Sequence, residues 1–117
     1  MSERPANLFI EDIWEALGRI ERYIEGSDQD RFRADEKTVD AVARNLEIIG
    51  EAASRLSDEF KDAHSDIEWR KIVGLRHRIV HDYFGLDLDI IWQILQTDLQ
   101  VFKTAIGAIR QHLDATG

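Results

Sequence analysis

The sequence contains no cysteine, a single proline and no long apolar run. Without cysteine there can be no thiolate nucleophile, no disulfide framework and no cysteine-based metal site. No apolar stretch approaches the ~20 residues that a membrane-spanning helix needs, and residues 1–5 lack the apolar core of a signal peptide. We therefore expect a protein that makes no membrane contact and stays in the cytoplasm.

Positive charge is also scarce, because 15 Lys and Arg residues face 23 Asp and Glu residues and give a net charge of −8. This balance argues against broad, charge-driven binding to nucleic acid, which depends on cations that displace counterions from phosphates. The cations are unevenly placed. The segment 69–81 has no acidic residue and carries Arg70, Lys71, Arg76, His77, Arg78 and His81. Such a basic segment on an acidic protein favours a small anionic target or an acidic partner.

Apolar residues make up 44% of the 117 residues and recur at helical spacing along most of the chain. This pattern predicts helices at about residues 8–25, 35–60, 68–82 and 87–113. Gly26 ends the first helix, residues 26–30 form a loop, and further breaks fall at residues 64–66 and 84–86. The length fits one domain, residues 1–117, and we predict an all-α fold, an antiparallel four-helix up-and-down bundle.

The most informative segment is residues 76–83, near the end of the third predicted helix. At 100° per residue, Arg76 falls within the broad apolar face of this helix, so its side chain should point inward. A buried guanidinium needs a carboxylate, a ligand or a subunit interface, and Glu47 and Glu51 are the candidate carboxylates. His81 lies ~140° from Arg76 around an ideal helix. One helix therefore cannot easily direct both side chains at a single phosphate.

The pattern R-x-x-x-x-H-x-Y, formed by Arg76, His81 and Tyr83, resembles the motif of HEPN-domain ribonucleases, specifically the HepT-like toxins paired with minimal nucleotidyltransferases. The similarity covers residues 8–113 in order and spacing and includes residues 48–53 with Leu56, residues 69–70 and 72–76, and residues 83–85 followed by Trp92. One position departs from the family, which commonly has asparagine directly after the arginine where this chain has His77. Imidazole can titrate and an amide cannot, so the polar network around the motif should differ.

The resemblance implies a HEPN-like bundle and the toxin of a type VII HEPN/MNT toxin–antitoxin system. It implies a metal-independent endoribonuclease that has no cofactor and cleaves RNA, but not DNA, through attack of the 2′-OH. Arg76 and His81 would be the catalytic residues, brought together across a homodimer that can join the antitoxin in a larger assembly. His77, Arg78 and Glu51 would support the site or contact the RNA.

Tyr83 has a different role by resemblance. In HepT-like toxins the tyrosine of the motif accepts AMP from the cognate nucleotidyltransferase antitoxin, which silences the toxin. An AMP group would add negative charge and bulk two residues from His81, and this would repel an incoming phosphate.

Simpler interpretations of the same residues stay open. Arg76 could form a structural salt bridge, and His81 could interact favourably with the C-terminal end of its helix. His77 and His81, four residues apart, could be two metal ligands, although a metal site usually needs a third and a fourth. At the level of the whole chain, the alternative is a catalytically idle module that docks a nucleotidyltransferase or binds a nucleotide, or that serves only assembly.

Overall fold

The computed structural model describes the chain over residues 5–82 and 87–116, and every regular element within these ranges is an α-helix. The helices are α1 (Ala6–Ile24), α2 (Gln29–Ala34), α3 (Glu36–Arg55), α4 (Asp58–Ala63), α5 (Trp69–Asp82), α6 (Leu88–Gln96) and α7 (Asp98–Thr116). The predicted all-α class is confirmed. None of the helices in these ranges is long and apolar enough to cross a bilayer.

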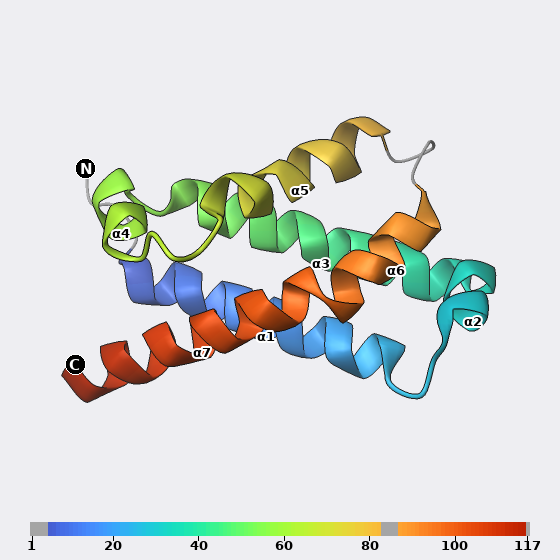
Figure 1. Ribbon diagram of the computed structural model, residues 1–117, viewed down its shortest axis with the longest axis horizontal. Coiled ribbons are helices and arrows are strands. Elements are labelled where there is room, and N and C mark those ends of the chain that lie inside the picture. Colours follow the sequence, from blue (N-terminus) through green and yellow to red (C-terminus); the bar gives the residue numbers. More distant parts are fainter. Residues whose placement is uncertain (1–4, 83–86, 117) are drawn as a thin grey trace.

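Helix α3 is the support of the fold, because α1 packs along one side of it and α5 along another (Figure 1). Helix α1 also packs against α7, and the short helix α2 contacts both α3 and α6. Their apolar faces form one core, whose largest fully buried side chains are Phe32, Ile10, Ile13, Leu17, Ile20, Leu46, Ile49, Leu95, Ile106 and Val42. Burial of these faces is the main stabilising contribution to such a bundle.

Asn45 is a polar residue buried in this core, at the contact of α1 with α3. Its amide nitrogen donates to the carbonyl of Ala41 at 2.8 Å, and its amide oxygen accepts from Arg19 Nε at 2.7 Å. Because a buried amide without partners is costly, these two bonds favour one register of α1 along α3.

Three predicted boundaries were wrong, and side-chain capping explains two of them. The segment 26–30 is a loop only at its start, because Asp28 accepts a hydrogen bond from the Arg31 amide and begins α2. The predicted helix at residues 35–60 is interrupted after Arg55, where the Ser57 hydroxyl accepts from the Phe60 amide and begins α4. A side-chain cap of this kind competes with the continuation of the preceding helix.

The third wrong boundary is inside the last predicted helix, residues 87–113, which is divided at Thr97 into α6 and α7. The Thr97 hydroxyl donates to the carbonyl of Gln93 at 2.8 Å, a bond that often bends helices. The third predicted helix matches α5, whereas the break predicted at residues 84–86 lies outside the described residues.

Asp35 begins α3 by accepting hydrogen bonds from both the hydroxyl and the amide of Thr38, at 2.7 and 3.2 Å. The hydroxyl contact, followed by the amide contact, lowers the pKa of Asp35 below its ordinary value. A carboxylate at a helix N-terminus also interacts favourably with the helix dipole. The start of the supporting helix is therefore fixed locally.

Helices α3 and α5 approach each other closely at Gly50. A Cβ atom at this position would lie 2.6 Å from Arg76 Cβ and 2.9 Å from the Arg76 backbone nitrogen. Because one of these neighbours is backbone, a rotamer change cannot relieve the overlap. Only glycine allows the two helices to pack at this distance.

We expect Gly50→Ala to lower the free energy of unfolding by about 1–2 kcal/mol, since an overpacking cost of about 1–3 kcal/mol exceeds the gain of up to ~1 kcal/mol in helix propensity. Gly18→Ala in α1 is the matched control, because its new Cβ would come no closer than 3.5 Å to the mobile end of Arg22. The control should be neutral or stabilising. Urea unfolding followed by circular dichroism measures both, and equal stability of the two variants would contradict the close-packing argument.

Candidate functional site

The candidate site lies where α5 crosses the C-terminal half of α3. Arg76 Nε lies 2.7 Å from Glu51 Oε2. Glu51 directly follows Gly50, so the same close approach that fixes the helices also brings this carboxylate to the arginine. Of the two carboxylates predicted as partners, Glu51 is therefore confirmed.

Glu47, the second predicted partner, lies one turn earlier on α3. Its Oε2 is 3.7 Å from Arg44 Nη1, an ion pair between two residues of the same helix. Such exposed pairs at i and i+3 contribute little to stability.

The prediction that Arg76 points inward was wrong, because 53% of its side chain is exposed to solvent. The helical wheel identified the correct face of α5, since the Cβ of Arg76 does meet α3. At Gly50, however, the two backbones are too close for a long side chain to lie between them. The guanidinium therefore ends at the edge of the interface, where Glu51 and water can both solvate it.

Arg55 is part of the same cluster, and the sequence interpretation did not include it. Its Nε and Nη2 both lie 2.9 Å from Glu51 Oε1, while the other oxygen of the carboxylate binds Arg76. The only signal in the sequence was the spacing of four residues between Glu51 and Arg55 on a predicted helix. That spacing is too common to indicate a site.

The other proposed site residues are described only in part. His77, Arg78 and His81 belong to α5, which stays helical through Asp82, but their side chains lie outside the described structure. Because the backbone between Arg76 and His81 is helical, their positions lie ~140° apart around the α5 axis, as expected. Tyr83 lies outside the described residues altogether.

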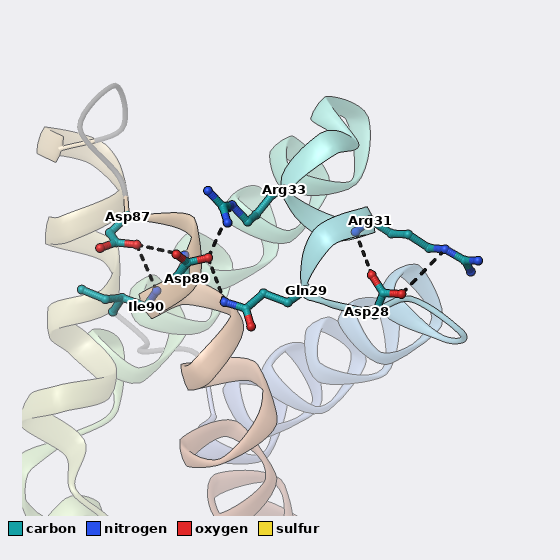
Figure 2. A network of polar contacts seen from close by, with 7 residues as sticks. All are labelled: Asp28, Gln29, Arg31, Arg33, Asp87, Asp89 and Ile90. Carbon is teal, nitrogen blue, oxygen red and sulfur yellow. Dashed lines mark hydrogen bonds and ion pairs between the residues drawn. The ribbon is translucent and has the colours of Figure 1, made fainter.

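Helix α6 begins in a network of polar contacts that connects it to α2 (Figure 2). Asp87 caps α6 by accepting from the amides of Asp89 and Ile90, at 3.0 and 3.4 Å. Asp89 in turn binds two residues of α2, Gln29 Nε2 at 2.8 Å and Arg33 Nε at 3.5 Å. A contact across 60 residues of sequence has no local signal, so sequence reasoning could not have found it.

On the side of α5 that faces α7 lies an open groove of about 610 Å³. We call it the α5–α7 groove, and it is lined by Asp66, Ile67, Glu68, Lys71, Ile72, Gly74, Leu75, Ile94, Asp98, Leu99, Val101, Phe102 and Ala105. Most of its lining residues are apolar, and one of them, Val101, is 74% exposed. Trp69 is the first residue of α5, and its ring meets Phe102 of α7 edge to face at 6.1 Å between centroids. This contact holds the N-terminal end of α5 against α7 beside the groove.

This arrangement can bind an oxyanion. A guanidinium has five N–H donors in a planar fork, so one edge can contact a carboxylate while another binds a phosphate oxygen. Arg76 meets Glu51 through Nε and is half exposed, which leaves room for such a ligand. Among the residues whose side chains the structure describes, which exclude His77 and His81, no three His, Asp or Glu side chains are placed to hold a metal ion.

Comparison with known proteins gives the affiliation of the chain. The family model described as ribonuclease HepT-like matches residues 13–109. A protein of Thermococcus cleftensis named "Probable ribonuclease HepT" is 36% identical over 103 residues, which are 88% of this chain and 94% of that protein.

Two further relatives have similar coverage. "Putative RNase MJ1380" of Methanocaldococcus jannaschii is 32% identical over 109 residues, 93% of this chain and all of that protein. "Putative RNase TTE0752" of Caldanaerobacter subterraneus is 31% identical over 103 residues, 88% of this chain and 92% of that protein. No solved structure matches the chain. Since the family model spans most of the sequence and these relatives match over nearly their whole lengths, the chain belongs to the ribonuclease HepT-like family.

Proposed function

We propose that this chain is a metal-independent endoribonuclease and the toxin of a HEPN/MNT toxin–antitoxin pair. The observation that carries the proposal is the state of Arg76, a half-exposed guanidinium fixed by Glu51 on the helix that also contains His81. An arginine held in this way can accept a phosphate without losing its orientation. Family membership and the names of the relatives support RNA as the substrate.

In the proposed reaction His81 takes the proton of a ribose 2′-OH, and the 2′-oxygen attacks the neighbouring phosphorus. The bond from phosphorus to the 5′-oxygen breaks, and the leaving oxygen receives a proton from solvent water. Arg76 stabilises the negative charge that builds on the phosphoryl oxygens. The products are a 2′,3′-cyclic phosphate and a free 5′-OH, and DNA cannot react because it lacks the 2′-OH.

We also propose that the active form is a homodimer. Arg76 and His81 lie ~140° apart around the axis of one α5 helix, so a single helix cannot easily direct both at one phosphate. The α5–α7 groove supports this assignment. It is an uncovered apolar surface beside the motif helix, and its rim carries charges of both signs, Asp66, Glu68 and Asp98 with Lys71. A surface with both signs can pair with a second copy of itself about a two-fold axis.

Tyr83 completes the proposal as the site of silencing, where the cognate nucleotidyltransferase transfers AMP to the phenolic oxygen and releases pyrophosphate from ATP. The added phosphate would repel RNA from Arg76 and His81.

The Arg76–Glu51 contact also supports a second candidate, a catalytically idle module that docks a nucleotidyltransferase or binds a nucleotide. An ion pair between neighbouring helices can be purely structural. The two functions differ in their dependence on His81, which the idle module does not need.

The first prediction concerns cleavage in a buffer that contains EDTA. We expect the chain to cut a single-stranded RNA and leave 2′,3′-cyclic phosphate ends, and we expect His81→Ala to slow cleavage by about 10²–10⁴-fold, the usual contribution of a general acid or base. His112→Ala, a histidine change on α7, should keep the normal rate. Gel analysis of an end-labelled RNA measures this. Equal rates for the two variants would favour the idle module.

The second prediction concerns the homodimer. Val101→Glu places a charge in the α5–α7 groove and should shift the mass measured by light scattering from two chains to one, whereas Gln96→Glu on α6, outside the groove, should not. Mixed dimers of Arg76→Ala and His81→Ala should regain activity, because one of their two sites combines an intact arginine with an intact histidine. Persistent dimers for Val101→Glu, or inactive mixtures, would contradict the assignment.

The third prediction concerns Tyr83. Co-expression with the cognate nucleotidyltransferase should add about 329 Da for each AMP to the intact mass, a covalent change of the kind that alters charge and function. Tyr83→Phe should lack the added mass, and Tyr23→Phe, a half-exposed tyrosine on α1, should retain it. An adduct that persists in Tyr83→Phe would place the modification elsewhere.

A further inference from the structure

Glu51 binds two arginines at once. An ion pair with Arg76 alone would be enough to link α3 with α5. Its Oε2 binds Arg76 Nε at 2.7 Å, and its Oε1 binds Nε and Nη2 of Arg55, both at 2.9 Å. One carboxylate balances one of the two cations. The cluster therefore keeps one positive charge on the surface of a chain whose net charge is −8.

The cations of this cluster are more accessible than the anion. Arg55 is 63% exposed and Arg76 53%, while Glu51 is 38% exposed. An anion that arrives from solvent therefore meets the two guanidinium groups before it meets the carboxylate. Each guanidinium has further N–H donors beyond those that contact Glu51.

We propose that Arg55 is a second phosphate-binding residue, so that Arg55 and Arg76, oriented by Glu51, bind neighbouring phosphates of one RNA strand. Glu51 is then a positioning residue that holds both guanidiniums at one location across the α3–α5 contact. This inference rests on the proposed function, because it takes RNA as the ligand. It adds a cation on α3 to a site whose cations, in the sequence analysis, all came from the basic segment of α5.

Charge and geometry favour an extended backbone over a single small anion. Two guanidiniums on separate helices that share one carboxylate lie side by side, as consecutive phosphates do along a strand. A protein this acidic needs local cations in such a row, since its overall field repels nucleic acid. The plain structural alternative is that Arg55, the last residue of α3, only interacts with the negative end of the helix dipole.

The test measures binding of a single-stranded oligoribonucleotide to the full chain that carries His81→Ala, so that the RNA is not consumed. Fluorescence anisotropy at a series of KCl concentrations gives both the affinity and its salt dependence. In that background, Arg55→Gln should weaken binding several-fold and reduce the slope of log K against log salt by ~0.7, the value for one lost phosphate contact on a single strand. Arg55→Lys keeps the charge and should keep most of the slope.

Arg44→Gln is the matched control, because Arg44 lies on the same helix, is 69% exposed and pairs with Glu47. It should leave the slope unchanged. A slope that Arg55→Gln does not alter, or that Arg44→Gln alters equally, would overturn the role of Arg55. Thermal unfolding of each variant shows whether a loss of binding reflects a loss of folded protein.

The outcome separates this inference from the proposed function. RNA that is bound through Arg55 but not cut by the chain with its native His81 would support the binding site and refute the nuclease. RNA that is cut while Arg55→Gln binds with an unchanged slope would refute only the role of Arg55. A chain that binds no RNA would refute both.

Discussion

The contact of Gly50 with the backbone of Arg76 is the constraint on which the rest of the site depends. It sets the distance between α3 and α5, and it leaves no space for the arginine side chain inside the interface. The Arg76 side chain must therefore extend along the surface, where Glu51, the residue after the glycine, supplies a carboxylate. A steric condition at one residue thus determines the electrostatics of the site, because packed interiors do not deform continuously.

Much of the fold could be predicted from the sequence, since apolar spacing identifies long amphipathic helices well. The third predicted helix and the partnership of Arg76 with Glu51 agree with the structure. The division of two predicted helices was missed. The apolar pattern continues across both breaks, and local hydrogen bonds of Ser57 and Thr97 interrupt the backbone without interrupting the pattern.

The exposure of Arg76 and the participation of Arg55 could not be predicted for a different reason. A helical wheel gives the direction of a residue but not the distance to the neighbouring helix, and that distance decides whether a long side chain is buried. Arg55 joins the site only because Glu51 has two carboxylate oxygens. One binds Arg55 on the same helix, and the other binds Arg76 on α5. The link from Asp89 to α2 likewise depends on the tertiary arrangement.

The contacts of Asp89 with α2 have a consequence for the surface that another protein would meet at the start of α6. Helix α5 rests on α3, and α6 is tied through Asp89 to α2, which itself packs on α3. Asp82 and Asp87 are the described residues on either side of residues 83–86. The helices next to them, α5 and α6, are therefore both held by α3, the first directly and the second through α2. A protein that approaches the start of α6 would therefore meet α2 at the same time, and the polar side chains of this six-residue helix would be part of the surface that it contacts.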